Sequence, residues 1–226
     1  MKKIVLTGGG TAGHVTPNIA LMPELKKRGY DISYIGSYEG MEKGMIMETK
    51  TPYYGIATGK LRRYFDLKNF TDPFRIIKGY FEARSRLKKI HPDVVFSKGG
   101  FASVPPVIAS KLLRVPVYVH ESDLSMGLAN KIAYKFATTM FTTFEQSKTL
   151  VKTRHVGAIT KVGMTRFDNS DQLDKIKEQF DEKLKTVLFI GGSTGAKVFN
   201  DFISKTPELI ENYNIINISG DSSLNP

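Results

Sequence analysis

The chain has 226 residues, of which 41% are hydrophobic and 24% are charged, and its formal net charge is +11. This composition is ordinary for a folded soluble protein and excludes an intrinsically disordered chain. The chain contains no cysteine, which excludes a disulfide framework and a thiolate metal site. The basic balance favours anionic partners such as nucleic acid, acidic lipid or a phosphorylated substrate. At about 150 residues per domain, the length predicts one complete domain and part of a second.

The N-terminal apolar run ends at Gly8, too early for the core of a signal peptide. Nowhere do about 18 apolar residues follow one another without a charge, so no transmembrane helix is expected. We therefore expect a cytosolic protein or one attached to the periphery of a membrane.

Short apolar runs alternate with helical patterns through the first part of the chain, as in a parallel sheet covered by helices on both faces. The expected strands are residues 4–6, 31–35, 53–56, 94–96, 115–119 and 140–142. The expected helices are residues 13–28, 72–89, 104–113 and 127–136.

The opening pattern recurs near the end of the chain. A polar stretch at 157–185, with one helix expected at 172–180, leads to a strand at 186–190. A glycine loop, a helix to about residue 210 and a strand at 214–219 follow. We interpret these elements as a second doubly wound domain that is too short to form its own sheet and core. Either the chain is a fragment or a partner completes this domain, and we favour a fragment.

The first glycine loop, Gly8–Gly13, has the pattern G-x-G-x-x-G between an expected strand and an expected helix. Glycines let the backbone approach a phosphate closely, and the helix N-terminus offers N–H groups and a positive dipole. A nicotinamide or flavin site also needs an acid at the end of the second strand. Glu39 is the only acid near that position, which disfavours a dinucleotide. A turn that binds nothing is the bland alternative.

Two further glycine loops follow expected strands. Ser193 lies in the loop 191–195, where its hydroxyl would either bind a diphosphate oxygen or cap the next helix. The loop 99–103 is a weak signal when it is taken alone. One phosphate-type loop in each domain suggests a ligand in a cleft between the domains.

Two histidine positions are candidates for chemistry. His14 follows the first glycine loop, where a helix N-terminus disfavours the imidazolium and leaves a neutral ring that can accept a proton. His120–Asp123 follows an expected strand, and parallel sheets bind ligands at the carboxyl ends of their strands. The alternatives are an exposed polar residue for His14 and a hydrogen-bonded loop for His120–Asp123.

A basic and aromatic stretch at 60–89 contains ten Lys or Arg and three Asp or Glu. Basic residues beside exposed aromatic rings suit an anionic bilayer, with each base contributing roughly 1 kcal/mol near such a surface. Nucleic acid is the rival partner, but no recognition-helix, RRM or zinc pattern accompanies the charge. An amphipathic helix with a solvated basic face is the third interpretation. The expected membrane-binding residues are Arg62, Arg63, Phe74, Arg75, Ile77, Lys78 and Phe81.

Four segments together resemble the MurG family, the peptidoglycan N-acetylglucosaminyltransferases of the bacterial inner membrane. They stand in the order and spacing of that family, and Ser125–Lys131 looks like the version found in Gram-positive cocci. These segments are Gly8–Val15, Ser97–Phe101, His120–Asp123 and Gly191–Ala196.

The resemblance implies a GT-B fold of two Rossmann-like, doubly wound parallel sheets, the second incomplete in this chain. Residues 1–160 would form the domain that binds acceptor and membrane, and 161–226 would begin the donor-nucleotide domain. The implied reaction transfers GlcNAc from UDP-GlcNAc, with inversion, to undecaprenyl-diphosphate-linked MurNAc-pentapeptide, at the cytoplasmic face of the cell membrane. No cofactor, no nucleic acid and, because no D-x-D motif is present, no metal is expected.

The resemblance also implies roles for residues. His14, as the base, and Glu121 are the catalytic candidates, and Gly99 and Gly100 form the acceptor diphosphate loop. Asp123 stands where many relatives carry Asn. Lys161 stands where many relatives carry Arg, and a lysine can neutralise a phosphate but cannot bind it through two parallel hydrogen bonds as arginine does. The expected donor and diphosphate ligands are Thr11, Ala12, Gly13, Asp123, Lys161 and Ser193.

Two other functions remain open from the sequence. The chain alone would be a non-catalytic module that binds lipid or membrane, because half of the expected donor site is missing from it. Alternatively, it belongs to another UDP-sugar enzyme of the same fold, such as a glycolipid synthase or an epimerase. The basic aromatic stretch fits a lipid acceptor and argues against the epimerase, and the order of the glycine loops argues against the synthase.

Overall fold

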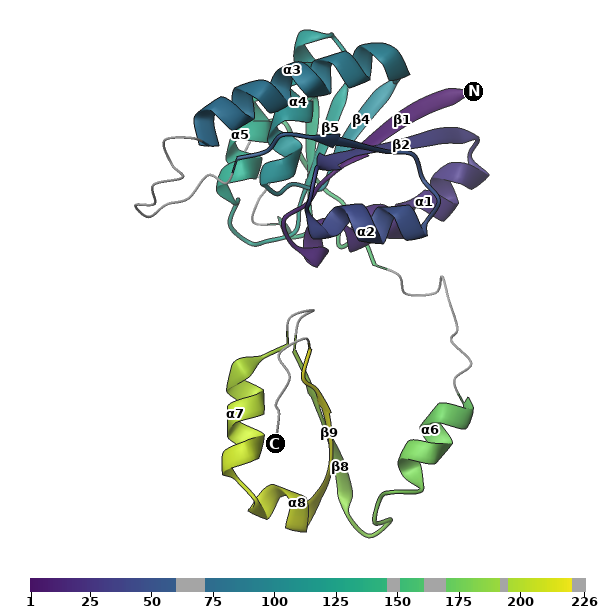
Figure 1. The fold of residues 1–226 in the computed structure, drawn as a ribbon, viewed down its shortest axis with the longest axis vertical. Helices are drawn as coiled ribbons and strands as arrows, with labels where there is room; N and C mark the ends of the chain where they lie inside the picture. Colours follow the sequence, from purple (N-terminus) through teal and green to yellow (C-terminus); the bar gives the residue numbers. More distant parts are fainter. Residues whose placement is uncertain (60–71, 146–150, 161–169, 192–194, 221–226) are drawn as a thin grey trace. The chain divides into compact units, whose positions relative to one another are not determined.

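The computed structural model describes residues 1–59, 72–145, 151–160, 170–191 and 195–220. The chain forms two compact units, unit 1 (residues 1–164) and unit 2 (residues 165–226), which are described separately below (Figure 1). The roles that the sequence assigns to domains 1–160 and 161–226 stay a prediction.

Unit 1 is built on a seven-stranded sheet in the order β3-β2-β1-β4-β5-β6-β7, and every neighbouring pair is parallel. The chain begins in the middle of the sheet with β1, extends to one edge through β3, and then returns to add β4 on the other side of β1. The strand order therefore reverses between β1 and β4. The strands are β1 (Lys2–Thr7), β2 (Tyr30–Ser37), β3 (Tyr53–Ile56), β4 (Val94–Ser97), β5 (Val117–Glu121), β6 (Thr139–Thr142) and β7 (Thr153–His155).

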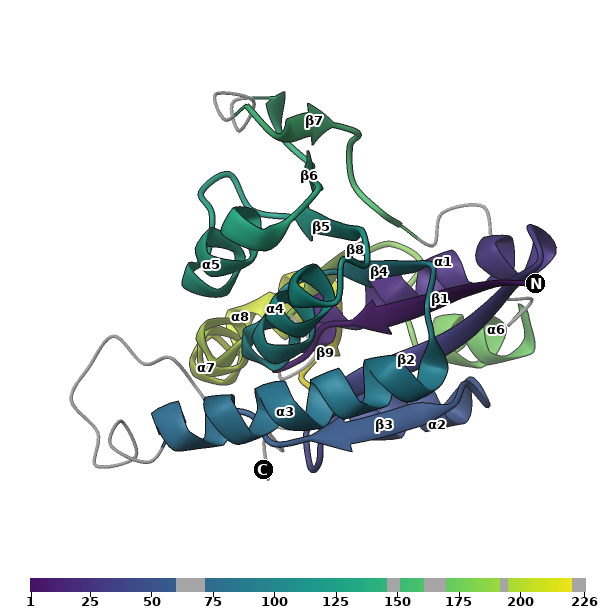
Figure 2. The same ribbon diagram turned by 90° about the horizontal axis from the view of Figure 1, so that it is seen from above.

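Helices cover both faces of this sheet (Figure 2). Because side chains alternate along a strand, Val5 of β1 packs beneath α3, α4 and α5, while Ile4 and Leu6 pack beneath α1 and α2. The helices are α1 (Thr16–Lys27), α2 (Met41–Glu48), α3 (Asp72–Ile90), α4 (Val104–Leu112) and α5 (Leu128–Phe136), with short 3-10 turns η1 (Ala12–His14) and η3 (Phe101–Ser103). The doubly wound parallel sheet expected from the sequence is confirmed for unit 1.

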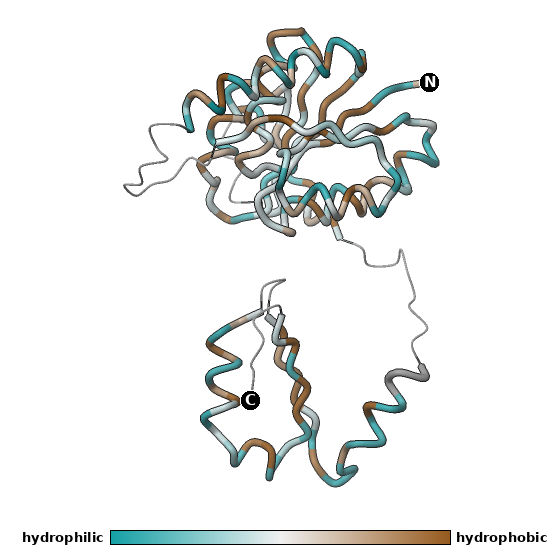
Figure 3. Tube along the Cα trace, in the orientation of Figure 1, coloured by the Kyte–Doolittle hydropathy of each residue, from teal (hydrophilic) through white to brown (hydrophobic). Residues whose placement is uncertain are grey.

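Unit 2 contains a two-stranded parallel sheet with three helices. Its strands are largely hydrophobic (Figure 3), yet no hydrophobic side chain among its described residues is buried. Asn200 is buried and binds the Ser219 carbonyl. The elements are α6 (Ser170–Lys177), β8 (Lys185–Ile190), α7 (Lys197–Lys205), α8 (Glu208–Asn212) and β9 (Tyr213–Ile218). This agrees with the expectation that these elements are too few to enclose a core.

The sequence analysis missed α2 and β7. On α2 the two buried positions are Ile46 and the carboxylate of Glu42, so the apolar period that marks a helix is absent. The strand β7 has three residues, of which only Thr153 is even half-buried, and it is defined by pairing with β6. Both elements depend on tertiary contacts more than on local patterns.

Two expected boundaries were wrong. The strand expected at 115–119 is β5, which begins after Pro116 and continues through His120 and Glu121 because these residues pair with β6. Pro116 lacks an N–H group and cannot donate to the sheet. The single helix expected up to residue 210 is divided into α7 and α8 around Pro207, which disfavours helical geometry at the preceding residue.

Candidate active site

The first glycine loop (residues 8–13) follows β1, and the second glycine loop (residues 99–103) follows β4. The strand order reverses between these two neighbouring strands. In open parallel sheets, ligands bind at this point, outside the carboxyl ends of the strands. The loops are joined by backbone hydrogen bonds: Gly9 N–H donates to the Gly99 carbonyl over 3.3 Å, and Lys98 N–H donates to the Thr7 carbonyl over 2.9 Å. The loop 99–103, a weak signal alone, is therefore one wall of the same site.

Close packing explains why glycine is needed where the two loops meet. Gly100 has φ of +80°, and a Cβ there would collide with the Gly9 carbonyl and lie 3.2 Å from Nδ1 of His14. The ring of Phe101 lies against Gly10, leaving no room for a side chain at that position. The second loop thus brings His14 and the first loop into one fixed arrangement.

Glu42 of α2 holds the first loop from inside the protein. Its buried carboxylate accepts hydrogen bonds from Ser37 N (3.0 Å), Ser37 Oγ (2.5 Å) and Gly10 N (3.3 Å). A Cβ on Gly9 would lie 2.5 Å from the carboxylate carbon, so that glycine makes room for Glu42. Because the Gly10 amide is already bonded, it is not a phosphate donor. Glu42 was not predicted to belong to the site, since it lies on a helix that the sequence analysis missed.

The amides that follow Gly10 are differently placed. Among the described residues, no acceptor is within hydrogen-bond distance of the N–H groups of Thr11, Ala12 or Gly13. They stand at the start of η1, and free N–H groups at the start of a helical turn are suited to an anion. This geometry places the expected phosphate ligands Thr11, Ala12 and Gly13 on the side of the loop that carries His14.

His14 is half-buried, and its Nδ1 lies 2.9 Å from Oγ1 of Thr11. Burial lowers the pKa of His14, and the positive charge of Lys98 lowers it further, against smaller opposing effects of Glu121 and Asp123. The ring is therefore neutral around pH 7. When Nδ1 carries the proton and donates it to Thr11, Nε2 keeps a lone pair and can accept a proton.

Lys98 is a buried cation that the sequence analysis did not single out. Its side chain is 1% exposed, and its ammonium donates a hydrogen bond to Oγ of Ser122. Burial lowers the pKa of Lys98, whereas the carboxylates of Glu121 and Asp123 raise it. Lys98 therefore joins the second glycine loop to the end of β5 and is the cation that influences His14. The signal available in the sequence was the position of this lysine between an apolar strand and two glycines.

Glu121 is buried and fully engaged in hydrogen bonds. Its carboxylate accepts from Asp123 N (2.9 Å), Gly127 N (3.2 Å) and Nδ2 of Asn130 (3.0 Å). Asn130, which the sequence did not indicate, also lies against Gly99. These contacts favour the hydrogen-bonded loop over a catalytic role for Glu121, while Asp123 is exposed beside it.

His120 lies inside β5 and is buried. Its Nε2 is 3.1 Å from the Gly157 carbonyl, so Nε2 carries the proton and donates it. Nδ1 has no partner among the described residues. Burial lowers the pKa of His120, which keeps the ring neutral.

Helix α3 carries exposed apolar side chains as well as a buried face. Phe74, Ile77 and Phe81 are 74%, 55% and 62% exposed, and Lys78 projects beside them. The buried residues of α3 are Asp72, Gly79, Ala83, Leu87 and Ile90. The helices of the described residues include none that is both long and apolar enough to span a bilayer.

Four expected site residues lie outside the described residues, so their predicted roles stay predictions. These are Arg62, Arg63, Lys161 and Ser193. The structure brings Thr11, Ala12, Gly13, His14, Gly99 and Gly100 together at the carboxyl edge of β1 and β4.

A sequence profile of the glycosyltransferase family 28 N-terminal domain matches residues 4–142, and the chain belongs to this family. The chain is 75% identical over 226 residues to a Streptococcus thermophilus protein named UDP-N-acetylglucosamine–N-acetylmuramyl-(pentapeptide) pyrophosphoryl-undecaprenol N-acetylglucosamine transferase. A Streptococcus mutans protein of the same name is 60% identical. The match covers 99% of this chain but 64% and 63% of these relatives, so the chain spans less than two thirds of their length.

Solved structures agree with this assignment. The crystal structure of Acinetobacter baumannii MurG matches with a TM-score of 0.71 at 25% identity. The match covers 98% of this chain and 60% of the MurG chain. A UDP-GlcNAc 2-epimerase from Neisseria meningitidis has a TM-score of 0.63 at 13% identity, covers 95% of this chain, and shares the fold alone. The expected family and the α/β glycosyltransferase fold are confirmed.

Proposed function

We propose that this chain supplies the acceptor side of an inverting N-acetylglucosaminyltransferase. The donor is UDP-GlcNAc, and the acceptor is undecaprenyl-diphosphate-linked MurNAc-pentapeptide, as the names of the relatives indicate for those proteins. The observation that carries the proposal is the neutral, Thr11-oriented ring of His14 beside the amides of Thr11–Gly13.

In the proposed reaction, Nε2 of His14 accepts the proton of the muramoyl 4-hydroxyl. The hydroxyl oxygen attacks the anomeric carbon of GlcNAc, and the bond from that carbon to the UDP oxygen breaks on the opposite face, which inverts the configuration. The N–H groups of Thr11, Ala12 and Gly13 stabilise a diphosphate at the first loop. Thr11 orients the ring of His14 through its contact with Nδ1, and Glu121 holds the loop between β5 and α5.

Steady-state transfer of labelled GlcNAc to a short-chain acceptor tests this proposal, with this chain and the S. thermophilus relative assayed side by side. Replacing the histidine that corresponds to His14 by alanine is expected to lower kcat about a hundredfold or more, because general-base catalysis contributes that much. His155→Ala is the matched control, since His155 is exposed and bonded to the Thr143 carbonyl. A loss of less than about tenfold at His14 would exclude the general-base role.

Of the alternative functions, an epimerase rests on likeness at 13% to 16% identity, which concerns the fold alone. The transfer assay distinguishes a non-catalytic lipid-binding module from a transferase, because only the transferase moves GlcNAc to the acceptor. If the longer relative transfers GlcNAc and this chain does not, the chain by itself is an acceptor-side module.

We also propose that the stripe of Phe74, Ile77 and Phe81 on α3 attaches the protein to the anionic, cytoplasmic surface of the cell membrane. Apolar side chains beside Lys78 would insert among lipid headgroups, and the bases would attract their charge. Phe81→Asp is expected to lower binding to phosphatidylglycerol vesicles about tenfold or more in a sedimentation assay. Val151→Asp, which changes a fully exposed residue away from α3, is the control. Equal losses in both variants would contradict the proposal.

A further inference from the structure

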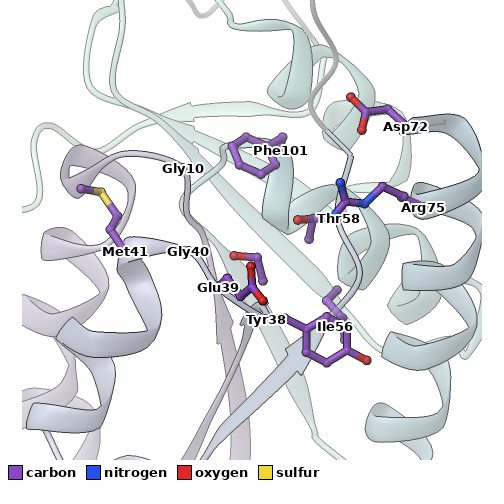
Figure 4. Close-up of a pocket in the computed structure, with 11 residues that line it drawn as sticks. Gly10, Tyr38, Glu39, Gly40, Met41, Ile56, Thr58, Asp72, Arg75 and Phe101 are labelled. Atoms are coloured by element: carbon purple, nitrogen blue, oxygen red, sulfur yellow. The ribbon is translucent and has the colours of Figure 1, made fainter. Parts of the chain in front are cut away.

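A pocket of about 510 Å³ lies beside the first glycine loop, between that loop and the first turns of α3 (Figure 4). The loops that follow β1, β2, β3 and β4 all contribute to it, so it is part of the same carboxyl edge as His14. Its volume is within the range of small-molecule sites. Its lining includes Gly10, Tyr38, Glu39, Thr58, Asp72, Arg75 and Phe101.

The walls of the pocket are fixed by internal contacts. The Tyr38 hydroxyl donates to Oε1 of Glu82 over 2.9 Å, and Oε2 of the same carboxylate accepts from Ala57 N over 2.7 Å. Tyr38 N–H also donates to the Ile56 carbonyl over 3.2 Å. On the other side, the Phe101 ring lies against Gly10. A site whose walls are held before the ligand arrives binds it at a lower entropic cost.

The lining combines three charged side chains, the acids Glu39 and Asp72 and the base Arg75, with two aromatic rings, and Asp72 is buried. Glu39 and Arg75 are both exposed, and neither forms an ion pair with a described residue. Figure 4 shows Arg75 extending from α3 toward Thr58, while Glu39 lies on the side of Tyr38 and Gly40. A prenyl chain would leave both charges without partners, and a nucleotide phosphate would be repelled by Glu39. A peptide has carboxylate, N–H and small apolar groups that match all of these surfaces.

We propose that this pocket binds the peptide of the acceptor, an inference that rests on the proposed function. Arg75 pairs with a peptide carboxylate, Glu39 accepts hydrogen bonds from peptide N–H or ammonium groups, and Tyr38 and Phe101 pack against the chain. Gly10 belongs both to the pocket wall and to the loop that carries Thr11 and His14. A peptide bound in the pocket and a sugar hydroxyl bound at His14 can therefore be parts of one acceptor molecule.

The test is direct binding, measured by calorimetry with this 226-residue chain. The probes are N-acetylmuramyl-pentapeptide, which has no lipid and no diphosphate, and N-acetylmuramic acid, which has no peptide. Arg75→Ala is expected to weaken binding of the peptide-bearing probe about tenfold, because hydrogen bonds to a charged partner are lost. Glu39→Ala is expected to weaken it severalfold. Lys89→Ala is the matched control, because it removes the same charge from the far end of α3.

Circular dichroism confirms that each variant is folded, and both Glu39 and Arg75 are exposed positions that tolerate alanine. Arg75 is also one of the residues that the sequence predicts to bind the membrane. Loss of peptide binding in Arg75→Ala with vesicle binding retained therefore supports the pocket assignment over that prediction and separates this role from membrane attachment. No binding of the peptide probe by the unchanged chain, an equal loss with N-acetylmuramic acid, or an equal loss in Lys89→Ala overturns it.

These measurements involve no transfer of GlcNAc, so they stand apart from the proposed function. If the transfer assay fails and the peptide still binds in an Arg75-dependent manner, the proposed reaction is wrong and the peptide site stands. If transfer succeeds and the peptide probe does not bind, the pocket assignment is wrong and the reaction stands.

Discussion

The two units share the same order of segments, a strand, then a glycine-rich sequence, then a helix, in very different surroundings. In unit 1 the strand is β1, and its Leu6 is completely buried. In unit 2 the strand is β8, and its Leu188 is 51% exposed. The arrangement therefore forms from local sequence in both units, whereas burial depends on how many neighbouring strands and helices are present to cover it.

The largest difference between the units is expected when the same apolar side chain is shortened in each. Leu6→Ala should lower the free energy of unfolding of unit 1 by about 2–5 kcal/mol, because a buried leucine leaves a cavity. Leu188→Ala should lower that of unit 2 by less than about 1 kcal/mol, because the side chain is already half in water. Hydrogen exchange of the β1 and β8 amides in denaturant measures each unit separately. Equal losses of unfolding free energy in the two units would contradict this difference in burial.

A smaller difference in stability between the units is expected when a charged side chain is removed from each. Glu42→Ala should cost about 3 kcal/mol in unit 1, since it leaves buried N–H groups of the glycine loop and Ser37 without acceptors. Asp201→Ala in unit 2 breaks an exposed ion pair with Lys197 of 2.9 Å and should lower the free energy of unfolding far less, because water screens an exposed pair. Urea unfolding followed by circular dichroism checks both. Glu42→Gln, which keeps one acceptor, should fall between them.

The smallest effect is a difference in acid sensitivity. All four histidines lie in unit 1, and burial lowers the pKa of both His14 and His120 below the ordinary 6.5. The unfolded chain then binds more protons than the folded one below pH 6.5, so the stability of unit 1 falls as the pH decreases through that range. Each histidine can contribute at most about 1.4 kcal/mol per pH unit. Unit 2 has no histidine and should show no such decrease, and His120→Gln should reduce the decrease in unit 1.

The parallel sheet and the glycine loops could be predicted because they depend on short-range patterns. Apolar runs such as Val94–Phe96 indicate buried strands, and glycines after β1 and β4 indicate close backbone approach to a ligand or another loop. His14 was identified from its place after the first loop. Its ring is neutral as expected, but the causes are burial and the charge of Lys98, whereas the sequence argument relied on a helix N-terminus. These signals are local, so no partner needs to be known before they are interpreted.

The missing parts of the site are those whose meaning depends on a distant segment. Glu42 is separated from Gly10 by 32 residues, and Lys98 from Ser122 by 24 residues. A glutamate or lysine in isolation indicates an exposed surface position, and only the folded sheet brings each one beneath a loop. The same dependence explains why Glu121 was predicted to be catalytic although its oxygens bind Asp123, Gly127 and Asn130.

By itself, the sequence determined the α/β class, the family, the position of the first loop and the amphipathic character of α3, because periodicity and motif spacing are properties of the chain alone. Only the tertiary structure decided which loops share a site, which charged groups are buried, and that a pocket with Glu39 and Arg75 borders Gly10. The physical reason is that desolvation and close packing act between segments that are far apart in sequence, and their effect is set by the strand order.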